Sequence, residues 1–201
     1  MYDVYCHNKA VFLDRDGTIN VDKGYLYKIS DFEFIPYVIE GLKLLQDAGY
    51  LLIIITNQSG IARGYYSEED FNRLNDWMLD TLRYKHKIHI TSVYYCPHLP
   101  LVSPISRKGK SEETREVIPE NLQKYRIHCH CRKPALGLFE KAIRDYEIDL
   151  SNSYAIGDKL RDLSICEKSD CKGFLILNNT IRRKGILSVS SLYEAAIKIS
   201  K

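Results

Sequence analysis

Short apolar runs, separated by longer stretches of helical periodicity, dominate the pattern of hydrophobic and polar positions along the chain. The short runs are continuous rather than alternating, which is typical of parallel strands buried on both faces. We therefore predict five strands, at Ala10–Leu13, Leu51–Ile55, Ser92–Tyr95, Tyr154–Ile156 and Phe174–Leu177.

The stretches between these runs carry apolar residues at the spacing of one helical face. The clearest begins at Ser67, which forms with Asp70 a pattern similar to a capping box. We predict helices at Tyr37–Ala48, Ser67–His86, Gly137–Tyr146, Lys159–Lys168 and Val189–Ile199. Strands that alternate with helices favour right-handed crossovers. The expected fold class is therefore α/β, a Rossmann-like open parallel sheet with helices on both faces.

The length of 201 residues and the hydrophobic fraction of 45% fit a single domain spanning residues 1–201. The longest apolar run, Leu51–Ile55, is far too short to cross a bilayer, so we expect no membrane partner. The net charge of +3 is too small to indicate nucleic-acid binding. The N-terminus lacks the basic and apolar regions of a signal peptide, which favours a cytoplasmic protein. The chain has no exposed heptad pattern, and we expect a monomer.

Polar residues follow the first two predicted strands, at the sheet edge where open parallel sheets bind their ligands. Asp14 and Asp16 come directly after the first strand, and Gly17 permits a tight turn there. Residues 56–59, Thr-Asn-Gln-Ser, follow the second strand. Their hydroxyl, amide and backbone N–H groups suit the binding of phosphate oxygens. Each motif alone also fits a plainer interpretation, an acidic turn or a set of ordinary turn residues.

Two further motifs are expected at the same edge. Arg132 and Lys133 precede a predicted helix and could neutralise an anionic substrate, although such a pair is often only a solvated surface. Asp158 follows the fourth strand, where it could bind Mg²⁺ or simply cap a helix. The convergence of all these motifs on one edge favours a site that holds a phosphate group and a divalent cation.

Cysteine and histidine residues gather in two short arms, Cys96-Pro97-His98 and Cys129-His130-Cys131. Three cysteines and one histidine form a recognised tetrahedral zinc set with no open position for catalysis. Zinc would also explain the long stretch without periodicity between the third strand and the next helix. The expected ligands are Cys96, His98, Cys129 and Cys131, with His128 and His130 as alternatives for the fourth. Ordinary buried cysteines, or a redox pair, are the competing interpretations.

The order of the strand-end motifs resembles that of the haloacid dehalogenase superfamily of phosphohydrolases, from Val11 to about Leu177. The resemblance implies that Asp14 attacks phosphorus to form an aspartyl-phosphate. It implies that Asp16 protonates the leaving oxygen and then activates water. Thr56 and Lys133 would bind the phosphoryl oxygens. Mg²⁺ would be held by Asp14, the backbone carbonyl of Asp16, and Asp158.

The two cysteine arms look like those of the branch that contains heptose bisphosphatases and histidinol phosphatases, and the residues after Thr56 are closer to the heptose enzymes. The resemblance implies a bacterial phosphatase without a large cap domain, which acts in the preparation of nucleotide-activated heptose for surface glycans. Its substrate would be a small sugar bisphosphate, heptose 1,7-bisphosphate, cleaved at the 7-phosphate. The implied substrate contacts are Asp22, Lys23, Gly24, Tyr25, Thr56, Asn57, Gln58, Ser59, Arg132, Lys133 and Lys159.

The zinc loop and insertion at residues 96–134 depart from that pattern, because Leu99–His128 is longer than the roughly dozen residues usual between the arms. The insertion is either a longer solvated loop or a lid that changes the substrate. Histidinol phosphate or another small sugar phosphate remains an alternative substrate. A zinc-organised binding module remains the alternative that is not an enzyme.

Overall fold

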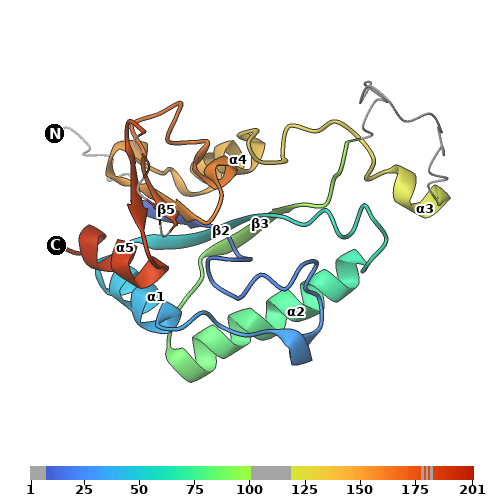
Figure 1. The fold of residues 1–201 in the computed structure, drawn as a ribbon, viewed down its shortest axis with the longest axis horizontal. Helices are drawn as coiled ribbons and strands as arrows, with labels where there is room; N and C mark the ends of the chain where they lie inside the picture. Colours follow the sequence, from blue (N-terminus) through green and yellow to red (C-terminus); the bar gives the residue numbers. More distant parts are fainter. Residues whose placement is uncertain (1–7, 101–118, 178, 180, 182) are drawn as a thin grey trace, which may run out of the picture.

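The computed structural model describes residues 8–100, 119–177, 179, 181 and 183–201 of the chain. Its strands form one sheet in the order β3-β2-β1-β4-β5-β6, and every neighbouring pair is parallel (Figure 1). The strands are β1 (Ala10–Leu13), β2 (Leu51–Asn57), β3 (Ser92–Cys96), β4 (Tyr154–Gly157), β5 (Lys172–Ile176) and β6 (Ile186–Val189). The strand order reverses between β1 and β4, which is the point where such sheets bind ligands.

Helices cover both faces of the sheet, as the sequence predicts. In Figure 1, α1, α2 and α5 lie below the sheet and α4 lies above it. The helices are α1 (Val38–Asp47), α2 (Glu68–Asp80), α3 (Glu120–Gln123), α4 (Gly137–Tyr146) and α5 (Leu192–Ile199). No helix within the described ranges is long and apolar enough to span a lipid bilayer.

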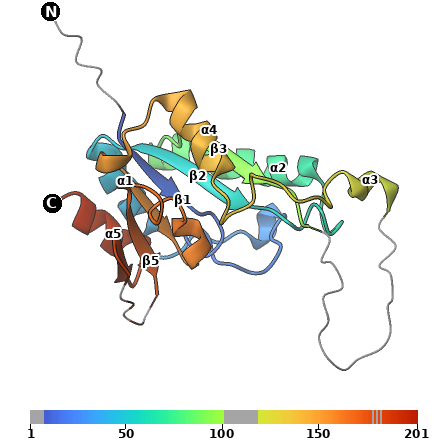
Figure 2. The same ribbon diagram turned by 90° about the horizontal axis from the view of Figure 1, so that it is seen from above.

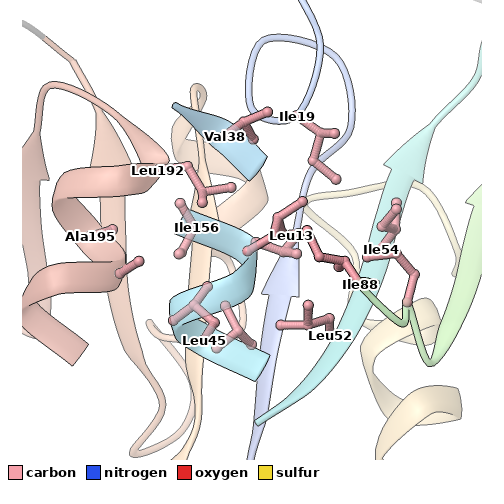
Figure 3. Close-up of a cluster of buried hydrophobic side chains, with 14 of the residues drawn as sticks. Leu13, Ile19, Val38, Leu45, Leu52, Ile54, Ile88, Ile156, Leu192 and Ala195 are labelled. Carbon is pink, nitrogen blue, oxygen red and sulfur yellow. The ribbon is translucent and has the colours of Figure 1, made fainter. Parts of the chain in front are cut away.

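Two hydrophobic clusters lie on opposite faces of the sheet, and β1 contributes to both. Val11 and Leu13 face the cluster under α1 and α5, whose packing is shown in Figure 3. Ala10 and Phe12 face the cluster under α4. All four residues are essentially inaccessible. This burial on both faces explains why the strand is a continuous apolar run.

The predicted helix at Ser67–His86 is confirmed, but its last turn is not α-helical. Ser67 and Asp70 form the capping box, in which each side chain bonds the other residue's backbone N–H. The α-helix ends at Asp80, and one π-helical turn, η2 (Thr81–Lys85), continues it. Lys87 then adopts a positive φ of 60°, which ends the helical segment.

Two of the sequence predictions near the C-terminal half are wrong. The helix expected at Lys159–Lys168 is only a 3₁₀ turn, η4 (Leu160–Leu163). The helix expected from Val189 starts at Leu192, because Val189 ends strand β6 and Ser191 caps the helix. Strand β6 lies at the sheet edge, where Leu187 is exposed and Ser188 half-buried, so it lacks the continuous apolar run of an inner strand.

Between β3 and α4 the structure describes residues 97–100 and 119–136, and the second of these stretches carries α3 (Figure 2). A backbone hydrogen bond joins the two stretches, since the Leu99 N–H donates to the Tyr125 carbonyl at 2.9 Å. The Tyr125 hydroxyl in turn donates to Glu68 at the start of α2, at 2.6 Å. The basic part of the predicted insertion, residues 106–111, lies outside the described residues.

Candidate active site

Asp14 and Lys133 form a buried ion pair at the carboxyl end of β1. The Lys133 Nζ atom lies 2.9 Å from Asp14 Oδ1 and donates to the Ile55 carbonyl of β2 at 2.5 Å. A second carboxylate, Asp162, lies 2.8 Å from the same ammonium. The three side chains are each at most 9% exposed. Lys133 is therefore held between two carboxylates that come from distant parts of the chain.

The charges of this cluster set its protonation. Burial acts to lower the pKa of Lys133, but Asp14 and then Asp162 outweigh burial and raise that pKa above 10.5. Burial raises the pKa of Asp14 above 3.8, although the Lys133 ammonium opposes this shift. Lys133 is therefore a permanent cation at neutral pH, next to a carboxylate that is costly to keep ionised without further positive charge.

Asp158 lies beside this pair and completes a group of three carboxylates. One oxygen each of Asp14, Asp158 and Asp162 lie within 4.8 Å of one another. Asp158 Oδ1 is buried without a hydrogen-bond partner, and burial raises the pKa of the Asp158 carboxyl. Carboxylate oxygens are the ligands that Mg²⁺ prefers, and an orphaned buried oxygen fits a cation as its missing partner.

The turn after β1 brings Asp158 close to the backbone. Gly17 has a φ of +85°, and a Cβ built there would lie 2.6 Å from Asp158 Oδ2. A side chain at this position would strain the backbone and displace the carboxylate. Gly17 is thus required by the position of the Asp158 carboxylate as well as by the turn.

Asp16 is oriented by three donor side chains rather than left free. Arg15, which is fully buried, pairs with Asp16 at 2.9 Å, and its guanidinium lies over the Phe71 ring. Asn20 donates to Asp16 Oδ1 at 2.9 Å, and Gln58 donates to Asp16 Oδ2 at 3.0 Å. The Asp16 carboxylate is therefore fixed in the cleft, as a proton-transfer group needs to be.

The residues at the end of β2 and directly after it have two roles: some line the cleft and one supports Lys133. Gln58 donates to the Thr56 hydroxyl at 2.9 Å and accepts from the Tyr66 hydroxyl at 2.6 Å. Asn57 bonds the backbone of Lys133 twice, accepting from its N–H at 3.0 Å and donating to its carbonyl at 3.1 Å. The contacts of Asn57 thus position Lys133, a role that its turn motif did not reveal.

Several of these residues line a cleft with a volume of about 430 Å³, which is within the range of small-molecule sites, whereas Lys133 and Asp158 are not among its lining residues. Most of the predicted substrate contacts border it. Lys159 spans the rim, with its ammonium 3.2 Å from Asp22 and 3.1 Å from Asp158. Lys23 does not line the cleft and pairs instead with Glu33 at 3.1 Å. The lining residues are Asp14, Asp16, Asp22, Gly24, Tyr25, Thr56, Asn57, Gln58, Ser59, Arg63, Tyr66, Arg132, Lys159, Arg161 and Asp162.

Four of these lining residues had no role in the sequence prediction: Arg63, Tyr66, Arg161 and Asp162. The sequence could have indicated Asp162, because it stands four residues after Asp158 and just beyond the same strand. The other three had none, because arginine and tyrosine are common on solvated loops. Their position in the cleft depends on how the loops fold against each other.

The cysteine arms converge as the sequence predicts. The Sγ atom of Cys131 lies 3.0 Å from that of Cys96 and 3.3 Å from that of Cys129. His98 Nδ1 lies 3.1 Å from the same sulfur, and all four donors lie within 4.8 Å of one another. His130 turns away to pair with Glu140 at 3.3 Å. The four donors are spaced closely enough to bind one zinc ion, at Zn–S distances of about 2.3 Å.

Comparison with known proteins is consistent with this geometry. A family model described as polynucleotide kinase 3 phosphatase matches residues 9–171. The chain is 47% identical over 164 residues to a D-glycero-beta-D-manno-heptose-1,7-bisphosphate 7-phosphatase of Haemophilus ducreyi, covering 82% of this chain and 80% of that protein. It is 39% identical over 200 residues to a D-glycero-alpha-D-manno-heptose-1,7-bisphosphate 7-phosphatase of Photorhabdus laumondii, covering 94% and 99%.

A solved structure also resembles the chain along most of its length. It is a D,D-heptose 1,7-bisphosphate phosphatase from B. bronchiseptica complexed with magnesium and phosphate. The sequence identity is 26% and the TM-score 0.73, covering 95% of this chain and 97% of that one.

Proposed function

Because this chain belongs to the heptose bisphosphate phosphatase family of the haloacid dehalogenase superfamily, we propose that it hydrolyses the 7-phosphate of D-glycero-D-manno-heptose 1,7-bisphosphate with Mg²⁺. The observation that carries the proposal is the buried Asp14–Lys133 pair beside the orphaned Asp158 oxygen. Its product would supply nucleotide-activated heptose for bacterial surface glycans. In this proposal the chain acts as a single cytoplasmic domain and as a monomer.

The donor set fits Mg²⁺. Asp14, Asp158 and the backbone carbonyl of Asp16 would hold the ion, and Asp162 adds a carboxylate to the same group. Mg²⁺, when bound, offsets the repulsion between these carboxylates and a phosphate dianion and polarises the phosphoryl group.

In the first step, an Asp14 oxygen attacks phosphorus and the bond from phosphorus to the C7 oxygen breaks. Asp16 donates a proton to the leaving oxygen, and Asp14 carries the phosphoryl group. In the second step, Asp16 accepts a proton from water, and the water oxygen attacks phosphorus. Inorganic phosphate leaves and the Asp14 carboxylate is restored. The bonds from Asn20 and Gln58 support this role by holding Asp16 in one orientation.

Lys133 and Thr56 would bind the oxygens of the transferred phosphoryl group. The Lys133 ammonium has a fixed place, because Asp14, Asp162 and the Ile55 carbonyl surround it. Thr56 is buried, and its hydroxyl already accepts from Gln58, so its proton is free to be donated to a phosphoryl oxygen. Such preorganised donors stabilise the charge of the transition state without reorganising during the reaction.

We also infer a structural zinc ion at Cys96, His98, Cys129 and Cys131. A set of four protein ligands leaves no position open for substrate. Cys131 is two residues from Lys133, and Arg132 between them donates to the His98 carbonyl at 3.2 Å. Zinc would therefore fix the segment that carries the catalytic lysine rather than take part in the reaction.

The direct test is phosphate release with Mg²⁺ from heptose 1,7-bisphosphate, as each anomer, and from histidinol phosphate, with the remaining phosphate located by NMR. We expect strong preference for a bisphosphate anomer and retention of the phosphate at C1. Preference for histidinol phosphate, or equal turnover of all three, would overturn the heptose assignment and leave only the phosphatase chemistry.

The variant Asp14→Asn distinguishes the proposed phosphatase from the alternative in which the protein is a zinc-organised binding module. We expect turnover to fall to near background while zinc content stays unchanged, because the nucleophile is lost and the cysteine arms are not. Asp76→Asn, the same change at an exposed position of α2, is the matched control and should keep full activity. Full activity in Asp14→Asn would contradict the mechanism.

A further inference from the structure

Among the described residues, two cysteines lie outside the four-donor group, Cys166 and Cys171. Four residues separate them in the sequence, in the loop between η4 and β5. Both are buried, with 7% and 2% of the residue exposed, and both belong to the hydrophobic cluster under α4. Neither lines the cleft that contains Asp14, so the chemistry of this pair is independent of the proposed function.

The two thiols are in contact. A hydrogen bond with Cys166 is the largest cause that raises the pKa of the Cys171 thiol, and burial is the second. A hydrogen bond raises the pKa of a thiol when the thiol donates it, because the bond then stabilises the protonated form. Cys171 is therefore the donor of the pair, and the Cys166 sulfur is the acceptor.

The loop between the two cysteines is shaped so that Cys171 returns to Cys166. The Ser169 hydroxyl donates to the Ile165 carbonyl at 2.8 Å and accepts from the Cys171 N–H at 3.2 Å. This one side chain thus joins the backbone next to one cysteine to the backbone of the other. A Cβ built at Gly173 would lie 3.2 Å from Cys166 Sγ, so the glycine leaves space for that sulfur.

Both cysteines also line a second cavity, which has a volume of about 490 Å³. A hydrogen peroxide molecule is far smaller than this cavity and can reach the thiols through it. Charged residues of both signs share the lining: Lys172, Arg183, Lys184, Glu167 and Asp170. The cations outnumber the carboxylates, and positive charge near a thiol favours the thiolate, which is the form that oxidants attack.

We propose that Cys166 and Cys171 form a redox-reactive dithiol site, which hydrogen peroxide converts into an intrachain disulfide. In the first step, the Cys166 thiolate attacks a peroxide oxygen and the O–O bond breaks, which leaves a sulfenic acid on Cys166 and, after protonation, water. In the second step, the Cys171 sulfur attacks the Cys166 sulfur and the S–O bond breaks. The departing hydroxide takes the Cys171 proton and becomes a second water. The two thiols together lose two electrons, which reduce the peroxide.

The roles of the two cysteines follow from their surroundings. Cys166 is the more exposed of the two, whereas the proton of Cys171 is held in the bond between them. Two molecules of a small thiol reverse the reaction by exchange, as they form their own disulfide and restore both cysteines. In a compartment that keeps thiols reduced, such a disulfide is transient and senses oxidants rather than stabilising the fold.

The test treats the full-length, zinc-loaded protein with hydrogen peroxide at a concentration that oxidises free glutathione. The remaining thiols are then blocked with iodoacetamide, and the chain is cut with trypsin. Because Lys168 lies between the two cysteines, cleavage there leaves peptides 162–168 and 169–172 joined only by the disulfide. We expect mass spectrometry to find this joined pair, lighter than the two separate peptides by two hydrogen atoms, and dithiothreitol to remove it. Separate, fully alkylated peptides after peroxide treatment would overturn the proposal.

Two single variants test the order of the steps. Cys171→Ser lacks the second thiol, so the sulfenic acid should persist on Cys166, where dimedone labels it. Cys166→Ser should give no label on Cys171, because Cys171 is not the residue that meets the peroxide. Labelling of Cys171 in Cys166→Ser, without labelling of Cys166 in Cys171→Ser, would overturn the assigned order.

Ser169→Ala tests the geometry while both thiols remain. Without the two bonds of Ser169, Cys171 is held less closely to Cys166, and we expect the disulfide to form roughly tenfold more slowly. The matched control is Ser200→Ala, which removes a similar bond at the end of α5, where the Ser200 hydroxyl donates to the Ala196 carbonyl at 2.9 Å. This control should react at the wild-type rate. Equal rates in the wild type and both variants would show that the loop does not bring the two cysteines together.

Discussion

The ammonium of Lys133 lies 2.8 Å from a carboxylate oxygen of Asp162, and both side chains are almost fully buried. Asp162 also accepts from the Lys159 N–H at 3.0 Å, so it is bound to the segment that carries Asp158. Through Asp162, the proposed phosphoryl-binding cation and the proposed Mg²⁺ ligands are held in one connected group.

Asp162→Asn should therefore reduce activity by misplacing Lys133. We expect kcat to fall roughly tenfold to a hundredfold, the size of effect that follows a small misplacement of a catalytic group. Asp170→Asn, an exposed change shortly after in the chain, is the control. The measurement is steady-state kinetics over a range of Mg²⁺ concentrations. Complete recovery at high Mg²⁺ would show that Asp162 acts as a metal ligand instead of positioning Lys133.

Magnesium affinity should weaken as the pH falls. Burial raises the pKa of both Asp14 and Asp158 in the metal-free protein, so protons compete with the cation at pH values above the ordinary 3.8 of an aspartate. The carboxylates bind Mg²⁺ only when they are ionised. Calorimetry at about pH 7.5 and about pH 5 should give several-fold weaker binding at the lower pH. Equal dissociation constants would contradict the pKa shifts.

Gly17→Ala should damage the metal site beyond the cost of backbone strain. Its Cβ would lie 2.6 Å from Asp158 Oδ2, and its φ is +85°. Gly185→Ala is a matched control, because Gly185 has a φ of +74° with no atom within 4 Å of the added Cβ. Both variants should lose about 1–2 kcal/mol of unfolding free energy from strain. We expect weaker Mg²⁺ binding and slower turnover in Gly17→Ala alone. If Gly185→Ala showed the same losses, the contact between the new Cβ and Asp158 could not be their cause.

The fourth zinc ligand can be identified by comparing His98→Ala with His130→Ala. His98 Nδ1 lies 3.1 Å from the Cys131 sulfur, whereas His130 pairs with Glu140. We expect His98→Ala to lower zinc content below one ion per chain after mild chelation, and to lower the melting temperature and then activity. His130→Ala should retain its zinc. The reverse result, measured by metal analysis of both variants, would move the ligand role to His130.

The zinc set itself is tested by Cys129→Ser against Cys166→Ser. Cys129 belongs to the four-donor group, whereas Cys166 is a buried cysteine outside it. A serine hydroxyl is a poor zinc ligand at neutral pH, so Cys129→Ser should lose zinc and stability, with activity falling because Lys133 is no longer held in place. One zinc ion per chain in Cys129→Ser would show that this ligand assignment is wrong.

The inner strands could be predicted from the sequence because each is buried on both faces and must be apolar throughout. The same argument placed Asp14 and Asp158 at one edge, since parallel strands end together. It failed for β6, an edge strand in which Leu187 is exposed, because burial no longer dictates every residue there. Helical spacing of apolar residues was also misleading after β4. A helix is predicted over Lys159–Lys168, but only the 3₁₀ turn Leu160–Leu163 forms there.

What the sequence by itself determined was the order of motifs and the type of chemistry, because those depend on residue identity and on which strand a residue follows. Only the tertiary structure decided which side chains meet. In that structure Asp162 pairs with Lys133, and Lys23 pairs with Glu33. His98, rather than His130, lies beside the cysteines. Such choices depend on how separate loops pack against each other, and no local pattern along the chain encodes a contact between loops that are distant in sequence.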